Sequence, residues 1–263
     1  MLQDENDDPW IPQLTHTQEI LWDVFQTCKK NVVSLAKKSP IYGWCIGDPT
    51  HGLHHMDKEL VSTRTSDHIE IAISSLAEIV KLKNLKSFYM VKGTGSHEFG
   101  QGSATALIAN FLETAFDKQI GYVNHALVKH DGLSFDLAHH GPGAGARNWL
   151  KGNILRLYTR SIMMDDLQAG REPPDLVVRA HFHNYVPETV KIRTNGHTHR
   201  TEAFILPSFS FLDDYARKVA KSPSSVTVGM VVVEVINGKI HEIHDGEDFI
   251  QRFDLRKEID LGI

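Results

Sequence analysis

Apolar side chains recur every three or four residues in four stretches of the chain. That spacing places them on one face of an α-helix. Pro40 follows the first stretch and Gly170 follows the last, and both residue types commonly end helices. The pattern therefore predicts helices over residues 17–38, from Ser66 to about Val80, from about Ala104 to Phe116, and over residues 147–168.

Short, continuous apolar runs lie between these helices and predict buried strands. Strands that alternate with helices form βαβ units and a largely parallel sheet. Farther along the chain, turn signals such as TNGH and NGK separate apolar runs that have no helix between them, which predicts antiparallel hairpins. The runs of the first kind are residues 41–46, 87–91, 133–138 and 175–180, and those of the second kind are residues 189–194, 200–206, 226–236 and 240–244. We therefore expect an α/β fold with a single domain over residues 1–263, of which residues 1–14 are irregular.

Composition narrows the class of protein. The 263 residues are 41% hydrophobic and 23% charged, as in ordinary globular domains, which excludes a disordered or collagen-like chain. No apolar run approaches the roughly 18 to 20 residues that span a bilayer, and the N-terminus lacks the basic and apolar regions of a secretory signal. We therefore expect a cytoplasmic protein without membrane contact, in which Cys28 and Cys45 stay reduced. The net charge of −5 predicts no broad nucleic-acid-binding surface.

Histidine is the unusual feature of the composition, because the chain contains 16 histidines in small groups. Neutral imidazole is the commonest metal ligand in proteins. A histidine or an aspartate follows each strand of the alternating region, and in α/β sheets ligands bind at the carboxyl ends of the strands. Aspartate and histidine together suit Zn, Mn or Fe, so the sequence predicts a metal site. The residues at the four strand ends are Asp48 with His51, Ser96 with His97, His139 with His140, and His181 with His183.

Two H-x-H pairs compete for the last ligand position. His181 and His183 follow a buried strand, so we expect their side chains at its carboxyl end. His197 and His199 follow a turn signal inside an alternating hairpin, which indicates a solvated hairpin tip. We favour the first pair, and the second pair remains the alternative site.

The four strand-end segments, in this order, resemble the calcineurin-like metallophosphoesterase superfamily. The family pattern runs D-x-H, G-D-x-x-D, G-N-H-[DE], a lone His and G-H-x-H. In this chain GDPTHG is similar to the second block, GSHE to the third, LAHHGPG to the lone-His block, and DLVVRAHFH to the last strand with its H-x-H pair. The similarity extends from about residue 15 to residue 240, and the sequence around these blocks is similar to phage and prophage members of the superfamily. It implies an αββα sandwich that holds a pair of metal ions and hydrolyses phosphomonoesters or phosphodiesters.

The resemblance also implies a role for individual residues. Asp48 would bridge two metal ions, because one carboxylate has two oxygens. His139 and His181 would bind one ion and His183 the other. His97 would not bind metal; it would donate a proton to the leaving group or hold the phosphoryl group. The expected cofactors are divalent Mn, Fe or Zn ions, and the expected partner is a phosphate ester, with nucleotides and nucleic acids among the candidates.

Three further residues beside these segments are candidates for the site. His140 is the alternative to His139 within the H-H-x-P string. Arg147 and Arg179 could pair with phosphate oxygens in a bidentate manner, although a solvated helix surface is an equally good interpretation of Arg147. We also expect that the chain can form a homo-oligomer.

Three departures from the family pattern affect these assignments. No D-x-H occurs upstream of Asp48, although in the family that motif ends the first strand and supplies two ligands. Ser96 stands where the family places a metal-binding Asn. His51 stands at the second Asp of the G-D-x-x-D block, as an added ligand or as a structural hydrogen-bonding residue. We therefore expect either a fragment that lacks the first strand or a fold with a degraded metal site, which would hold one ion or none instead of two.

Two other functions fit parts of the sequence. One is a non-catalytic descendant of the same fold that serves as a binding or structural module, because the missing D-x-H would remove most of one metal site. The other is a metallo-β-lactamase-type hydrolase, indicated by His51, His54, His55 and Asp57, whose spacing departs from H-x-H-x-D-H. We rank the metallophosphoesterase first and the lactamase type last.

Overall fold

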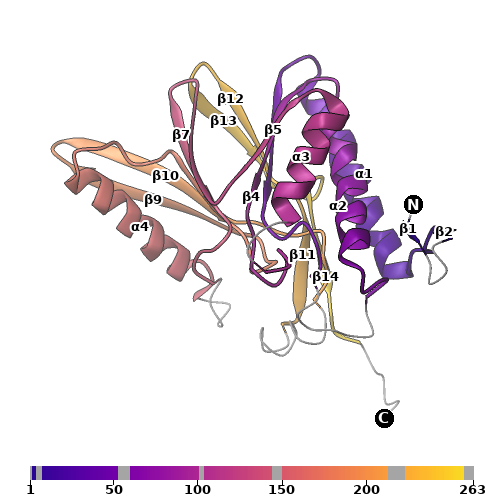
Figure 1. Ribbon diagram of the computed structural model, residues 1–263. Coiled ribbons are helices and arrows are strands. Elements are labelled where there is room, and N and C mark those ends of the chain that lie inside the picture. Colours follow the sequence, from indigo (N-terminus) through magenta and orange to yellow (C-terminus); the bar gives the residue numbers. More distant parts are fainter. Residues whose placement is uncertain are drawn as a thin grey trace, which may run out of the picture.

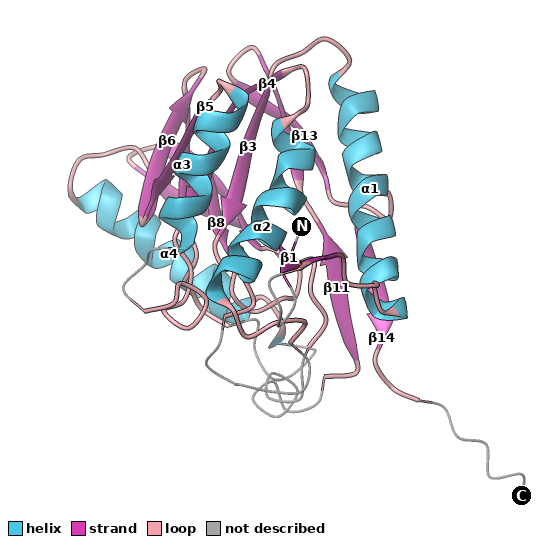
Figure 2. Ribbon diagram, turned by 45° about the vertical axis from the view of Figure 1, so that its right-hand side comes forward, coloured by secondary structure: helices cyan, strands magenta, loops and turns pink. Residues whose placement is uncertain are grey.

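Two main β-sheets and four helices dominate the computed structural model, which describes residues 2–3, 8–52, 60–100, 104–143, 150–212 and 223–257 (Figure 1). Three helices lie on one side of the molecule and the fourth, α4, lies on the other (Figure 1; Figure 2). Among the described residues no helix is long and apolar enough to cross a membrane. The helices are α1 (His16–Ala36), α2 (Thr65–Val80), α3 (Ala104–Phe116) and α4 (Asn153–Gln168).

The first sheet is parallel and has the strand order β3-β4-β5. Helices α2 and α3 cover one of its faces, where their apolar side chains pack against Phe88, Met90 and Ile120. This packing explains the helical periodicity of the sequence, because each helix buries one apolar stripe. The strands are β3 (Ile41–Ile46), β4 (Leu85–Val91) and β5 (Gln119–Val123).

The second sheet is mixed and has the strand order β6-β7-β8-β10-β9. Its three central strands run parallel, and the two edge strands run antiparallel to their neighbours. Side chains of β10 alternate between two environments: Ala203 and Ile205 pack with Leu155 of α4, whereas Phe204 points to the opposite face. The strands are β6 (His125–His130), β7 (Leu133–Ala138), β8 (Leu176–Arg179), β9 (Val186–Thr194) and β10 (His197–Ile205).

The inner faces of the two sheets share one hydrophobic core. Ile46 and Val91 of the first sheet are buried in the same cluster as Leu137, Val178 and Phe204 of the second. The sheets therefore face each other, with helices on their outer faces. Because β3, β4, β7 and β8 all contribute to this core, the loops that follow them can meet at one end of the molecule.

Three short strand pairs and helix α1 complete the described part of the chain. Helix α1 packs through Val24 and Cys28 against Val226 and Val228 of β11. A capping box formed by Thr15 and Gln18 begins this helix. The remaining strands are β1 (Leu2–Gln3) with β2 (Pro9–Trp10), β11 (Ser225–Gly229) with β14 (Ile250–Asp254), and β12 (Val232–Ile236) with β13 (Lys239–His244).

A large groove runs along the free edge of β3. Within the described residues β3 pairs only with β4, so it is an edge strand of its sheet. Every residue of β3 lines the groove, and so does every residue of β12. Successive side chains of a strand point to opposite faces, so a continuous run of lining residues means that the groove follows strand edges. Its volume is about 3610 Å³, and it extends to Asp48 and His139.

The α/β class and most of the predicted elements are confirmed. Helix α1 matches the prediction over residues 17–38 to within two residues at each end, and β3 and α3 have the predicted bounds. Gly170 adopts a φ of +71° just beyond α4, as expected for a residue that ends a helix. Residues 147–149, the predicted start of that helix, lie outside the described residues.

Other predicted elements differ from the structure. The strand expected over residues 226–236 is two strands, of which β11 ends at Gly229 and β12 begins at Val232. Gly229 adopts a φ of +147°, and a Cβ there would lie 2.0 Å from the Phe249 carbonyl oxygen. Strands β5, β6 and β14 are not predicted by the sequence pattern, since each is short and carries polar side chains. The C-terminal region is not built from hairpins alone, because β10 pairs parallel with β8. Residues 1–14, expected to be irregular, contain the short strands β1 and β2.

Candidate metal centre

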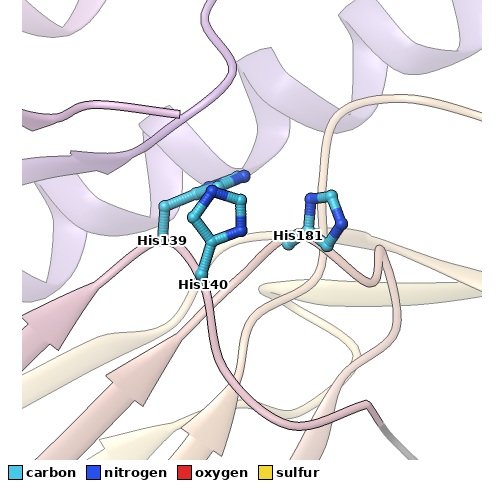
Figure 3. Close-up of side chains that lie close together, drawn as sticks. All are labelled: His139, His140 and His181. Carbon is cyan, nitrogen blue, oxygen red and sulfur yellow. The ribbon is translucent and has the colours of Figure 1, made fainter. Parts of the chain in front are cut away.

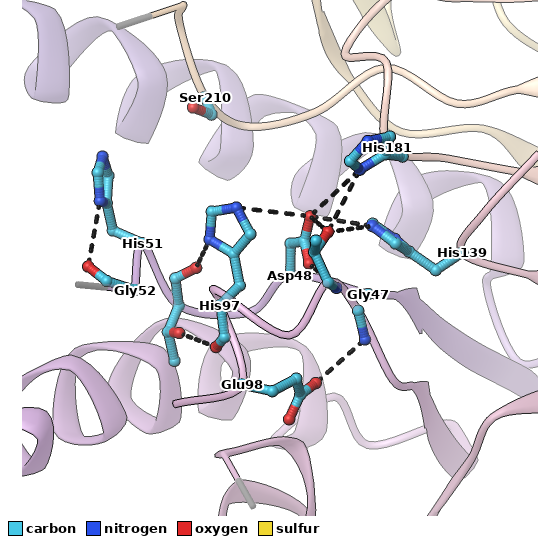
Figure 4. A network of polar contacts seen from close by, with 12 residues as sticks. Gly47, Asp48, His51, Gly52, His97, Glu98, His139, His181 and Ser210 are labelled. Carbon is cyan, nitrogen blue, oxygen red and sulfur yellow. Dashed lines mark hydrogen bonds and ion pairs between the residues drawn. The ribbon is translucent and has the colours of Figure 1, made fainter. Parts of the chain in front are cut away.

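Four strand ends from the two sheets converge on Asp48 (Figure 4). Asp48 follows β3, Thr94 and His97 follow β4, His139 follows β7 and His181 lies just beyond β8. From Asp48 Oδ2 the distances are 2.9 Å to His139 Nε2, 3.2 Å to Thr94 Oγ1, 3.8 Å to His97 Nε2 and 3.9 Å to His181 Nδ1. The structure thus brings the predicted aspartate and three of the predicted histidines together at the carboxyl ends of the strands.

Asp48 is held as a carboxylate by its surroundings. Burial alone would raise its pKa, but hydrogen bonds to His139 and His181 outweigh burial and hold the pKa of Asp48 far below its usual range. The backbone N–H of Thr94 donates to Asp48 Oδ1 at 2.7 Å. Gly93 makes this close approach feasible, because a Cβ there would lie 2.0 Å from the same oxygen. Asp48 is therefore an ionised carboxylate in a fixed orientation at neutral pH.

The ring of His139 is oriented by a backbone carbonyl. Its Nδ1 donates a hydrogen bond to the Ile46 carbonyl oxygen at 2.7 Å, which leaves Nε2 facing Asp48. Gly47 lies directly against the ring, where a Cβ would be 2.0 Å from His139 Nδ1. Burial by itself would lower the pKa of His139, but the hydrogen bond and charge of Asp48 raise it above its usual value. In metal-binding histidines a backbone carbonyl commonly holds one ring nitrogen and orients the other toward the metal, and Nε2 of His139 is oriented in this way toward Asp48.

His97 is oriented in the same way on the other side of Asp48. Its Nδ1 donates to the Thr50 carbonyl oxygen at 3.0 Å, so Nε2 points toward the carboxylate (Figure 4). The loop that carries His97 is anchored by Glu98, which is buried and accepts hydrogen bonds from the backbone N–H groups of Gly93 and Thr105. His97 is partly exposed, as a group that meets a substrate must be.

The segment after β8 brings two histidines into the cluster with unusual backbone geometry. His181 has a φ of +72° and His183 a φ of +48°, and Asp48 also adopts a positive φ of +49°. Non-glycine residues in this left-handed region cost conformational energy and concentrate at functional sites. Burial lowers the pKa of His183 to about 4, so its ring is neutral at pH 7. The exposed ring of His140 lies 5.2 Å from that of His181, between centroids (Figure 3).

Thr94 belongs to the cluster although the sequence pattern does not identify it. Its hydroxyl oxygen lies 3.4 Å from His139 Nε2 and 3.3 Å from His181 Nδ1, in addition to its contact with Asp48. A lone threonine in a glycine-rich loop carries no distinctive signal in a single sequence. The one available indication is its position directly after the first glycine that follows β4, at the carboxyl end of a parallel strand.

Two other sequence candidates lie outside the cluster. The Ser96 hydroxyl makes no contact with Asp48 or the histidines; the backbone of Ser96 lies against Gly52 instead. His51 is exposed, and its ring is 6.4 Å from that of His97, between centroids. In Figure 4 it points away from Asp48. Neither residue is therefore placed as a ligand.

The contacts of Arg179 give it a structural role rather than a place in the cluster. Its side chain is buried, its Nη1 lies 2.6 Å from Asp136 Oδ1, and its Nε and Nη2 donate to the Tyr158 hydroxyl. These contacts occupy the guanidinium donors that would be needed to bind a phosphate. Arg147, the other arginine candidate, lies outside the described residues, as do His54, His55 and Asp57 of the lactamase-like string.

The alternative H-x-H pair lies at a hairpin tip, away from the cluster. His197 and His199 begin β10, directly after the turn at Asn195 and Gly196 that joins it to β9. His199 Nδ1 is 3.1 Å from the exposed carboxylate of Glu172. The expected hairpin tip is confirmed and His197 is exposed, whereas the side chain of His199 is only 16% exposed.

Two observations show that the residues present fit a divalent cation. His183 Nδ1 is buried without a hydrogen-bond partner among the described residues, and a buried polar atom of this kind calls for a ligand. The other candidate donors are imidazole nitrogens and a carboxylate oxygen held a few ångströms apart; those of His139, His140 and His181 all lie within 4.8 Å of one another. Such a donor set suits Mn, Fe or Zn.

Comparison of the chain with models of known protein families and with curated protein sequences gave no match. The geometry around Asp48 therefore carries the functional interpretation.

Proposed function

We propose that this protein is a metal-dependent phosphoesterase of the calcineurin-like metallophosphoesterase superfamily, acting on phosphomonoesters or phosphodiesters. The observation that carries the proposal is the convergence of Asp48, His139 and His181 from three strand ends, with His97 beside them (Figure 4). Nucleotides and nucleic acids are among the candidate substrates.

The layer arrangement supports the αββα sandwich that this proposal implies. The inner faces of the two sheets share a core, and α2, α3 and α4 lie on the outer faces. The free edge of β3 and the groove beside it support the view that the sandwich lacks one strand next to β3. A fold with that strand missing agrees with the absence of a D-x-H motif upstream of Asp48.

The residues divide into ligands and a proton donor. A divalent cation in such a centre supplies a Lewis acid that lowers the pKa of water and stabilises negative charge on phosphoryl oxygens. Asp48 Oδ2, His139 Nε2 and the ring of His181 would hold it, and the ring of His183, with its unpartnered Nδ1, is a further candidate ligand. His97 Nε2 faces the same centre and can donate a proton to the leaving-group oxygen, while the Thr50 carbonyl keeps its ring in place. We propose one ion rather than two, because the described cluster contains a single carboxylate, Asp48.

Metal content and hydrolysis of aryl phosphates test the proposal. Purified protein incubated with Mn²⁺ or Zn²⁺ should bind about one equivalent and hydrolyse p-nitrophenyl phosphate or bis(p-nitrophenyl) phosphate. Asp48→Asn keeps the size of the side chain but removes the charged ligand, and the loss of several kcal/mol of metal-assisted stabilisation corresponds to a drop in rate of about a hundredfold or more. His197→Ala, at the hairpin tip, is the matched control and should keep the wild-type rate.

The same experiment separates the alternatives. Bound metal without turnover would favour the non-catalytic binding module, for which the missing D-x-H motif is the supporting observation. Zero bound metal together with zero turnover would refute the phosphoesterase proposal. Equal rates for the wild type and Asp48→Asn would show that hydrolysis occurs elsewhere.

A further inference from the structure

The hydroxyl of Thr94 lies nearly equidistant from three candidate ligand atoms. The distances from Thr94 Oγ1 are 3.2 Å to Asp48 Oδ2, 3.4 Å to His139 Nε2 and 3.3 Å to His181 Nδ1. A hydroxyl has one hydrogen and two acceptor lone pairs, so it could satisfy all three neighbours only if both imidazoles carried a proton on these nitrogens. A neutral His139 carries its proton on Nδ1, which donates to the Ile46 carbonyl oxygen, so its Nε2 has none to donate to Thr94. All three distances are also longer than a usual O–H···O or O–H···N bond. The arrangement is better explained as four donor atoms that face a common centre.

The spacing of these atoms matches a coordination shell. Ligands about 2.0–2.2 Å from a tetrahedral ion are separated from each other by roughly 3.3–3.6 Å. The three distances from Thr94 fall close to this range, and Asp48 Oδ2 lies 2.9 Å from His139 Nε2 and 3.9 Å from His181 Nδ1. We propose that Thr94 Oγ1 is a direct ligand of the cation, together with Asp48 Oδ2, His139 Nε2 and His181 Nδ1. This inference rests on the metal binding in the proposed function and replaces Ser96 as the hydroxyl ligand.

Backbone contacts, not the Thr94 side chain, hold the loop in place. The Thr94 N–H donates to Asp48 Oδ1 at 2.7 Å, and Glu98 Oε1 accepts from the Gly93 N–H at 3.1 Å. Both contacts survive any change of the Thr94 side chain. A substitution at this position therefore removes the hydroxyl while keeping the orientation of Asp48, which makes the role of the hydroxyl separable from that of the loop.

The donor set has a consequence for the ligand that the centre attracts. Asp48 contributes one negative charge, and two neutral imidazoles and a neutral hydroxyl contribute none. A divalent cation held by these four donors keeps a net charge of +1. This charge favours an anionic further ligand, such as a phosphate group, over a neutral one. Three hard or borderline donor types and no thiolate select Mn²⁺, Fe²⁺, Co²⁺ or Zn²⁺.

Cobalt binding tests the inference without any measurement of activity. The visible absorption of Co²⁺ reports its ligands, and competition with a chelator gives its dissociation constant. Thr94→Val and Thr94→Ala remove the hydroxyl, with and without keeping the size of the side chain, whereas Thr94→Ser keeps it. Both hydroxyl-free variants should bind Co²⁺ at least about tenfold more weakly than the wild type and show a changed spectrum, a loss of the size produced by weaker changes around metal sites. Thr94→Ser and the control Ser96→Ala should behave as the wild type.

The possible outcomes are distinct. Wild-type affinity and spectrum in a hydroxyl-free variant that folds, as shown by near-UV circular dichroism, would overturn the role of Thr94 and leave the phosphoesterase proposal standing. A weakened Ser96→Ala variant with unaffected Thr94 variants would return the hydroxyl ligand to Ser96. A wild-type protein that binds no Co²⁺ would refute both proposals.

Discussion

His183 lies just beyond β8 with a positive φ, and its Nδ1 is buried without a partner among the described residues. Burial is the largest influence on this ring and lowers its pKa to about 4; the charge of Asp48 acts in the opposite direction and does not compensate. The pKa of the neighbouring His139 is raised instead, because this ring hydrogen-bonds directly to Asp48. The pKa values of two histidines of one cluster therefore shift in opposite directions, since one is paired with a carboxylate and the other is only buried.

The lowered pKa of His183 predicts a loss of stability in acid. The unfolded chain takes up a proton on this residue near its usual pKa of about 6.5, whereas the folded protein does so only near 4. Its contribution is thus fully present above about pH 6.5 and is lost as the pH falls toward 4, by an amount on the order of 3 kcal/mol. Urea unfolding of the metal-free protein with a chelator present measures this loss, which should amount to about 2 kcal/mol between pH 7 and pH 5 because pH 5 lies about 1.5 units below the usual pKa.

His183→Asn should reduce the pH dependence, because the titrating ring is removed. His197→Asn, on the exposed hairpin tip, should unfold with the wild-type pH dependence. Identical pH profiles for His183→Asn and the wild type would show that the ring is solvated.

At the scale of the elements, the end of β8 is joined to its neighbours by one buried ion pair. Arg179 pairs with Asp136 of β7 at 2.6 Å and donates to the hydroxyl of Tyr158 on α4. Gly141 lies against the Arg179 stem, where a Cβ would be 2.6 Å from its Cγ. The pair connects β7, β8 and α4 directly below the segments that carry His139 and His181.

Asp136→Asn should lower the free energy of unfolding by about 3–5 kcal/mol, because it leaves the buried guanidinium of Arg179 without a counter-charge. Asp166→Asn is the matched control. It breaks a pair with the exposed side chain of Arg171 and should cost less than about 1 kcal/mol. Urea denaturation of the two variants measures both values, and equal losses would contradict a special role for the Arg179 pair.

At the scale of the whole molecule, β3 has one edge that pairs with no other strand among the described residues. Tyr42 is 47% exposed on this strand, and apolar residues of β12 line the same groove. An exposed apolar strand edge is a template for pairing with another chain. The groove therefore connects the expectation of a homo-oligomer with a specific surface.

We predict that the protein self-associates through the free edge of β3. The wild-type protein should bind the apolar dye ANS and form larger species as its concentration rises, as measured by fluorescence and sedimentation velocity. Tyr42→Lys places a charge on the edge and should reduce both effects. Leu157→Lys, at an exposed position of α4 that does not line the groove, is the control and should leave both unchanged. A wild-type protein that stays monomeric without binding dye would show that the groove is closed in solution.

The sequence predicted most of the candidate site because parallel strands impose a common direction. Once residues 41–46 and 133–138 are read as strands, the side chains that follow them must lie at carboxyl ends, and Asp48 and His139 do so. Thr94 and Glu98 could not be found in this way, because hydroxyls and buried carboxylates occur in many loops without a functional role. Strand β6 was missed because its sequence, HALVKH, does not alternate between apolar and polar residues: the apolar Leu127 lies on the exposed face.

By itself, the sequence determined the α/β class, the main helices and the groups of histidines at strand ends, because these follow from local periodicity and strand direction. The tertiary structure alone decided which of those groups meet. It brought Thr94 rather than Ser96 to Asp48, left His51 exposed, and used Arg179 to join elements. The physical reason is that distances between strand ends depend on how two sheets pack face to face. That packing is set by a core cluster in which Val91 and Phe204 are buried together, although they lie more than a hundred residues apart in the chain.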